Sequence, residues 1–211
     1  MSDWNTHLYC ASKVNEVLGF KGKDLDMFFY GNIFPDINIG WIITPEVKID
    51  HTNTHFDDMG QGYFWSPSRF FDKYKEEILS GNPLLLGYLF HIWLDVKFMT
   101  DFVDRLPMSM MIDKKYLVRE YKWKDARFFI KKYQFTLEKD NIDAIVEASK
   151  LMEEVNVTSQ DLNIAADFVN NSSDAITSDS YYVYSEDAFN EFYDEICENF
   201  VNWVKEHNIV R

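Results

Sequence analysis

The chain has 211 residues, of which 46% are hydrophobic, and a formal net charge of −14. This length suffices for a full-sized hydrophobic core, and we expect one domain over residues 1–211. The acidic balance argues against a dedicated nucleic-acid-binding protein, because a phosphate backbone requires a basic surface.

The cysteine pattern and the N-terminal residues bear on the compartment. Cys10 and Cys197 lie far apart and form no C-x-x-C motif, so we expect reduced thiols. The first residues lack the basic and apolar segments of a signal peptide, and no run approaches the roughly 18 apolar residues of a membrane span. We therefore expect a cytoplasmic protein with no transmembrane segment. A secreted protein without its leader has the same pattern.

Residues 5–18 are predicted to form the first helix. Apolar positions recur every three or four residues from His7 onward, and Gly19 follows where a C-terminal cap is expected. This spacing places His7 on the inward face. The segment 31–54, by contrast, is punctuated by glycine and proline and is predicted to be a long ordered loop that carries Asp36.

Two helices are predicted in the middle of the chain, over residues 66–81 and 83–106. Each begins with a polar N-cap residue followed by proline in the first turn. The inward stripe of the second helix includes His91 and Asp95. Residues four apart on a helix differ in direction by roughly 40°, so these two side chains project side by side.

The rest of the chain also has helical periodicity. The predicted helices cover residues 121–137 and 141–155, a segment that starts with the capping-box pattern of Thr158 and Asp161, and a final segment from about Ser185. Only the polar segment 170–180 has the composition of a linker. The sequence therefore predicts an all-α, single-domain helical bundle.

Three of the five histidines and two aspartates form the candidate site: His7, Asp36, His55, His91 and Asp95. Imidazole and carboxylate together suit zinc and neighbouring transition metals, and a catalytic site needs about three protein ligands per metal with one position open for water. Each residue has a plainer interpretation, since a histidine on an apolar helix face is more often a hydrogen-bonded core residue. The joint pattern favours a metal site, with His51 as an alternative ligand.

Four motifs occur in order along the first half of the chain: Thr6-His7, Pro35-Asp36-Ile37, Thr54-His55-Phe56 and Gly87-Tyr88-Leu89-Phe90-His91-x-x-x-Asp95. Together they resemble the bacterial zinc-dependent phospholipase C family. That family is all-helical, binds a cluster of zinc ions at the end of its helices and hydrolyses phosphodiesters; single-strand-specific fungal nucleases are more distant relatives. The resemblance implies a fold of this type and a metal-dependent phosphoric ester hydrolase.

The resemblance also implies a ligand set. One metal ion is expected on Asp36, His55, His91 and Asp95. Asp95 is expected to bridge to a second ion that His7 also binds. The family's third ion uses further histidines that this chain lacks, and Asp101 alone lies near one of their positions. The expected cofactor is therefore one or two zinc ions, or another divalent transition metal.

A binuclear centre also suits the charge of a phosphate substrate. Two divalent ions with Asp36, Asp95 and one hydroxide carry a net charge of about +1, whereas one ion with the same ligands is negative and repels an anionic ester. Asp36 is also a candidate general base, and the sequence does not separate that role from metal ligation. The expected substrate is a small phosphate ester, a nucleotide or a phospholipid headgroup. The alternative is a non-catalytic helical protein with a structural metal or a degenerate site.

Eight basic residues between Lys114 and Lys132 form the one basic segment of this acidic chain. Such a segment can contact anionic lipid headgroups or a phosphorylated substrate. The plainer interpretation is a solvated helix face that balances nearby carboxylates.

Overall fold

The computed structural model describes residues 4–57, 65–104, 124–171 and 180–209, with the backbone alone for 101–104. All regular secondary structure in these residues is helical, which confirms the all-α prediction. The helices are α1 (Trp4–Leu18), α2 (Lys23–Gly31), α3 (Phe34–Ile37), α4 (His51–Thr54), α5 (Pro67–Lys73), α6 (Lys75–Leu79), α7 (Pro83–Asp104), α9 (Ile142–Ser149), α10 (Ser159–Asn170) and α11 (Glu186–Glu206). Residues 124–130 are helical as well.

Several helix starts follow the predicted capping chemistry. The Ser66 and Ser185 side chains each accept a hydrogen bond from a backbone N–H in the first turn of α5 and α11. Thr158 and Asp161 form both hydrogen bonds of a capping box at the start of α10. These short polar patterns determine where the helices begin because they satisfy N–H groups that have no partner within the helix.

Two predicted helices are wrong in extent because tertiary contacts compete with the helical ladder. The helix predicted over 66–81 is broken at Tyr74, whose ring packs against Phe70 and whose hydroxyl donates to Glu154. The helix predicted over 121–137 ends at residue 130. Beyond it, the Asn170 side chain binds both the backbone N–H and the carbonyl of Leu137.

Two further predictions need correction. Residues 31–54 are not one long loop, because the short helices α3 and α4 lie within them. Helix α9 ends at Ser149 instead of continuing to residue 155. Most of the predicted linker, 172–179, lies outside the described residues, and the single-domain organisation stays a prediction.

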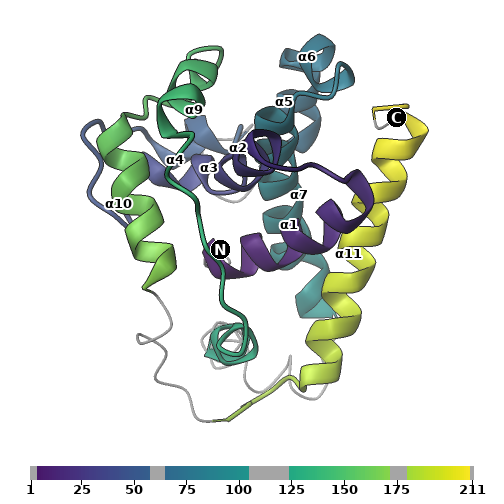
Figure 1. Cartoon of the computed structure of the whole chain (residues 1–211). Coiled ribbons are helices and arrows are strands. Elements are labelled where there is room, and N and C mark those ends of the chain that lie inside the picture. Colours follow the sequence, from purple (N-terminus) through teal and green to yellow (C-terminus); the bar gives the residue numbers. More distant parts are fainter. Residues whose placement is uncertain (1–3, 58–64, 105–123, 172–179, 210–211) are drawn as a thin grey trace.

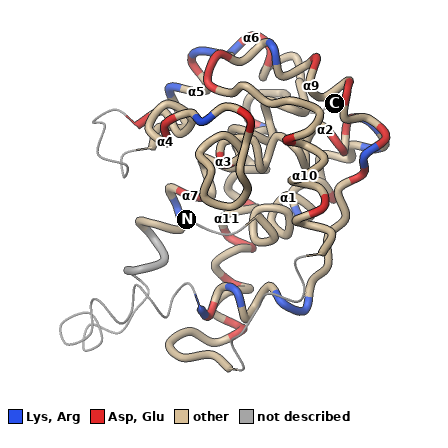
Figure 2. Tube along the Cα trace, turned by 90° about the vertical axis from the view of Figure 1, so that its left-hand side faces the viewer, with Lys and Arg blue, Asp and Glu red and all other residues tan. Residues whose placement is uncertain are grey.

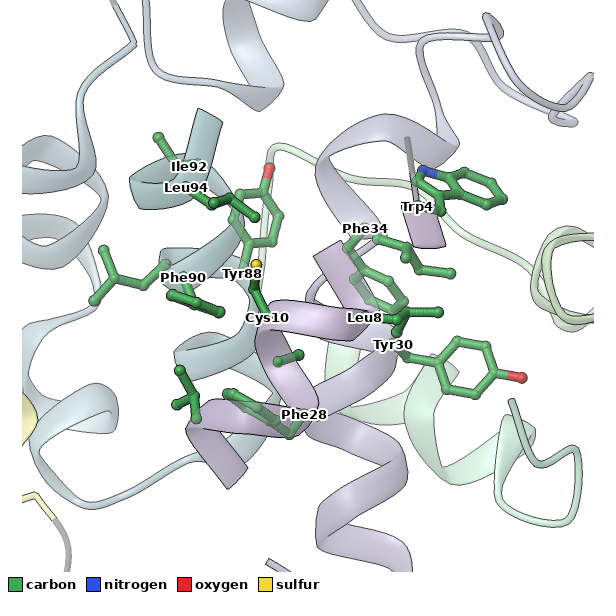
Figure 3. Close-up of a cluster of buried hydrophobic side chains, with 14 of the residues drawn as sticks. Trp4, Leu8, Cys10, Phe28, Tyr30, Phe34, Tyr88, Phe90, Ile92 and Leu94 are labelled. Carbon is green, nitrogen blue, oxygen red and sulfur yellow. The ribbon is translucent and has the colours of Figure 1, made fainter. Parts of the chain in front are cut away.

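Helix α7 lies at the centre of the fold. It contacts α1, α2, α3, α5, α6, α9 and α11. In Figure 1 it runs through the middle of the molecule, with α11 on one side and α9 and α10 on the other. Figure 3 shows buried side chains of the core around it, with Tyr88 and Phe90 of α7 on one side and Tyr30 of α2 on the other, near Leu8 and Phe34. No helix in the described residues is long and apolar enough to cross a membrane.

Glycine allows α2 and α7 to cross in backbone contact. A Cβ atom added at Gly87 would lie 2.2 Å from the carbonyl oxygen of Phe28, and one added at Gly31 would lie 2.2 Å from that of Leu84. Any side chain at either position would force the two helices apart. The close crossing matters for the site because His91 lies one turn beyond Gly87, and Asn32 directly follows Gly31.

We predict that Gly87→Ala lowers the free energy of unfolding by about 1–3 kcal/mol, because the methyl group overlaps the α2 backbone. Alanine would otherwise favour the helix by about 1 kcal/mol. Chemical denaturation measures the change. Asn202→Ala at an exposed position of α11 is the control and is expected within about 0.5 kcal/mol of the native protein. A Gly87→Ala protein as stable as the native one would refute the close crossing.

Candidate metal centre

The structure brings all five predicted site residues together. His7 comes from α1, Asp36 from α3, His55 from the C-terminal cap of α4, and His91 and Asp95 from α7. Each of the five side chains is fully buried. Buried imidazole and carboxylate groups in one cluster are costly unless they are paired or bind a metal ion.

Two histidines and two aspartates place ligand atoms close together. The Nε2 atoms of His55 and His91 lie 3.2 Å apart. Oδ1 of Asp36 lies 3.7 Å from the first and 3.9 Å from the second, and Oδ2 of Asp95 lies 3.6 Å from both. The ligand atoms of a tetrahedral zinc ion are about 3.3–3.6 Å apart. Asp36, His55 and His91 can therefore hold one divalent ion, with Asp95 close to both histidines.

His7 lies on the other side of Asp95. Its Nε2 atom is 3.3 Å from Oδ1 of Asp95, the oxygen that does not face His55 and His91. The His7 and His91 rings stack with centroids 3.8 Å apart and planes 6° apart. Two overlapping sets of ligand atoms result, one with His7, His91 and Asp95 and one with Asp36, His55 and His91. His91 belongs to both sets.

The backbone selects the tautomer of His91. Its Nδ1 atom lies 2.7 Å from the carbonyl oxygen of Asn32 at the C-terminal cap of α2. A carbonyl oxygen only accepts hydrogen bonds, so Nδ1 carries the proton and Nε2 presents a lone pair to the cluster. Supporting hydrogen bonds of this kind orient metal-binding histidines.

A threonine hydroxyl lies beside Nδ1 of His55. Oγ1 of Thr54 is 2.9 Å from this nitrogen and 3.2 Å from the carbonyl oxygen of His51. When the hydroxyl donates to that carbonyl, it accepts from Nδ1–H, and Nε2 of His55 then presents a lone pair, the form that binds a metal ion. Tyr88 of α7 donates to the carbonyl of Thr54 at 2.6 Å and holds this turn against the core.

Burial keeps these histidines neutral. It lowers the pKa of His55, and it lowers the pKa of His91 well below its usual value, with a further contribution from nearby His7. Burial and the neighbouring Asp95 raise the pKa of Asp36 well above its usual value. Burial alone would raise the pKa of Asp95, but the adjacent imidazoles of His55 and His7 outweigh this effect and lower it well below its usual value. Neutral imidazole is the form that binds metals.

Several potential ligand atoms meet in the centre. Nε2 of His55 lies 3.2 Å from Nε2 of His91, and when both histidines carry their proton on Nδ1 these two lone pairs face each other. Neither carboxylate oxygen of Asp36 has a hydrogen-bond partner among the described residues. A divalent cation at this position would satisfy these atoms together.

The other candidates lie apart from this centre. His51 stacks on the His55 ring at 3.9 Å but supplies no atom to either ligand set. His207 lies at the end of α11 and bonds to the carbonyl of Trp203. The side chain of Asp101 and the basic residues up to Lys122 lie outside the described residues.

Sequence reasoning missed the groups that orient the ligands. The Asn32 carbonyl leaves no signal in a sequence because every residue has a carbonyl group. Thr54 was noted beside His55 as part of a motif, but its hydroxyl acquires its role only through the turn of α4. Comparison of the chain with models of protein families, with curated proteins and with solved structures found no match.

We predict that Thr54→Val weakens zinc binding by about 10–100-fold, because Nδ1 of His55 loses the acceptor that fixes its tautomer. Competition with a chromophoric chelator measures the affinity. The control is Thr52→Val on the same helix, since the Thr52 hydroxyl bonds to the exposed Asp50 and not to a site histidine. Equal affinities for the two variants would show that the hydroxyl does not support the site.

Proposed function

We propose that the chain is a metal-dependent hydrolase of phosphate esters with two divalent ions, most simply zinc. The observation that carries the proposal is the position of the Asp95 carboxylate. One of its oxygens faces His7, and the other faces His55 and His91. A carboxylate in this position can bridge two ions. When bound, such ions activate water as a nucleophile and stabilise charge on the phosphoryl oxygens.

The two positions differ in how completely the protein surrounds them. Asp36, His55, His91 and Asp95 supply four ligands to the first position, which is the full set for a tetrahedral ion. The described residues supply His7 and Asp95 to the second position. Ligand positions therefore stay open at the second ion for water and substrate, as catalysis requires.

The charge balance of the centre supports an anionic substrate. The positive charge of two divalent ions exceeds the negative charge of Asp36 and Asp95, so the centre is cationic. The chain as a whole has a net charge of −14. Figure 2 shows basic positions interleaved with acidic ones along the described chain. The centre itself would supply the positive charge that attracts a phosphate ester, in line with the resemblance to the phospholipase C family.

Asp36 is assigned as a ligand through Oδ1 and as the candidate general base through Oδ2. Oδ1 faces both His55 and His91, and Oδ2 has no hydrogen-bond partner among the described residues.

A structural metal is the second candidate function. The complete burial of all five side chains favours it, because a four-ligand site closed to solvent is typical of structural zinc. The two functions differ in the number of ions and in turnover. A structural site holds one ion and hydrolyses nothing.

We predict that the purified protein binds two zinc ions and hydrolyses bis(p-nitrophenyl) phosphate, and that chelator or His91→Ala abolishes both properties. His91 is a proposed ligand of the first ion and lies 3.6 Å from Oδ2 of Asp95, the carboxylate proposed to bridge the two ions, so its loss is expected to disturb both positions. Elemental analysis and release of p-nitrophenol give the two measurements. The control is His207→Ala, since His207 lies away from the centre and is expected to keep native metal content and rate.

The outcomes separate the two candidate functions. One zinc ion per chain without hydrolysis would establish the structural site and reject the hydrolase. Less than about half an equivalent of metal after reconstitution would reject both.

We predict that Asp36→Asn separates ligation from base catalysis. If Asp36 acts through Oδ2 as a base, the variant keeps most of its zinc and loses about 100-fold or more in kcat, since the amide oxygen still occupies the ligand position. Metal content and rate are measured on the same preparation. Native kcat at full zinc occupancy would exclude the general-base role.

A further inference from the structure

A second group of polar atoms lies beside the metal centre and has no role in it. Nε2 of His51 and Nε1 of Trp65 are both buried and have no hydrogen-bond partner among the described residues. Each side chain is only 9% exposed. A buried polar group without a partner costs free energy, so each such group indicates a missing ligand or water molecule.

Both side chains lie against the His55 ring. The His51 ring stacks on it at 3.9 Å, and the centroid of the Trp65 ring lies 5.5 Å from both His51 and His55. The backbone fixes this arrangement, because the N–H of Ser66 donates to the carbonyl of His55 at 3.3 Å. Trp65 is thereby held next to a proposed metal ligand, although ten residues separate the two in sequence.

The chemistry of these two atoms indicates the class of the missing partner. An indole N–H only donates hydrogen bonds, so Trp65 requires an acceptor and cannot bind a cation. Imidazole can present N–H at Nε2 when an acceptor is there. Two donors beside a cationic centre are suited to an anionic oxygen.

The other buried indoles show why Trp65 is distinctive. Nε1 of Trp4 and of Trp93 also lack hydrogen-bond partners among the described residues. The Trp4 indole lies near Asp36 and offsets part of the rise in the pKa of that carboxyl, so an acceptor is already close by. Trp93 packs against Phe200 and Trp203 and has no ring contact with a site histidine among the described residues.

A stack of aromatic rings connects this corner of the site with the surface. Trp41 is 61% exposed and stacks on the His51 ring at 4.8 Å. Three rings therefore follow one another from the surface to the proposed metal ligand, in the order Trp41, His51, His55. His51 thus lies between an exposed side chain and the proposed metal position.

We propose that His51 and Trp65 bind an oxygen of a phosphate group beside the metal centre. The inference rests on the proposed function, because the ions supply most of the attraction for the anion. It assigns His51 as a phosphate-binding residue in place of the metal ligand considered from the sequence. The shared chemistry is a tetrahedral oxyanion, either inorganic phosphate or the phosphate of an ester.

The test is titration of the zinc-loaded protein with inorganic phosphate by isothermal calorimetry. Trp65→Phe and His51→Phe keep an aromatic ring at each position and remove the nitrogen. We expect each variant to keep native zinc content and to bind phosphate about tenfold or more weakly, as expected for a lost hydrogen bond to an anion. A second titration with phosphocholine shows whether the same donors accept an ester.

Trp93→Phe is the matched control, because it removes a buried indole N–H that is also unpartnered but lies away from the histidines. It is expected to bind phosphate as the native protein does. Affinities within twofold of native for Trp65→Phe or His51→Phe at full zinc content would overturn the inference and leave the metal centre intact. A protein that takes up no zinc would overturn both.

Discussion

The arrangement of the centre depends on one constraint, the approach of two imidazole Nε2 atoms to 3.2 Å. The Asn32 carbonyl holds the proton of His91 on the far side of its ring, and the Thr54 hydroxyl can do the same for His55. With both protons there, lone pairs at this distance repel each other, and the nearby carboxylates add to the repulsion. The fold tolerates the cluster in a buried position most readily when a cation lies at its centre.

The close packing of α2 against α7 at two glycines produces this arrangement. Gly31 and Gly87 allow α2 and α7 to touch, and the contact places the Asn32 carbonyl within hydrogen-bond distance of His91. Tyr88 on the same helix holds the Thr54 carbonyl and so fixes the turn that ends in His55. The helix that supplies two ligands thus also orients the groups that prepare them.

The sequence predicted the parts of this arrangement that local geometry determines. A spacing of four residues on a helix placed His91 beside Asp95, and the apolar stripe of the first helix placed His7 inward; both side chains are buried in the cluster. Residues 31–54 were interpreted as a loop because their short helices are stabilised by tertiary contacts. The roles of Asn32, Thr54 and Trp65 depend on tertiary contacts between different segments. The hydrophobic periodicity of a sequence does not predict which segments make such contacts.

Anomalous scattering from crystals of the zinc-loaded protein, collected on both sides of the zinc absorption edge, tests the central claim most directly. The account predicts a peak about 2.0–2.2 Å from the Nε2 atoms of His55 and His91 and from one oxygen each of Asp36 and Asp95. The contradicting result is a centre without a peak, in which one imidazole has turned over and the two Nε2 atoms share a proton in an ordinary hydrogen bond.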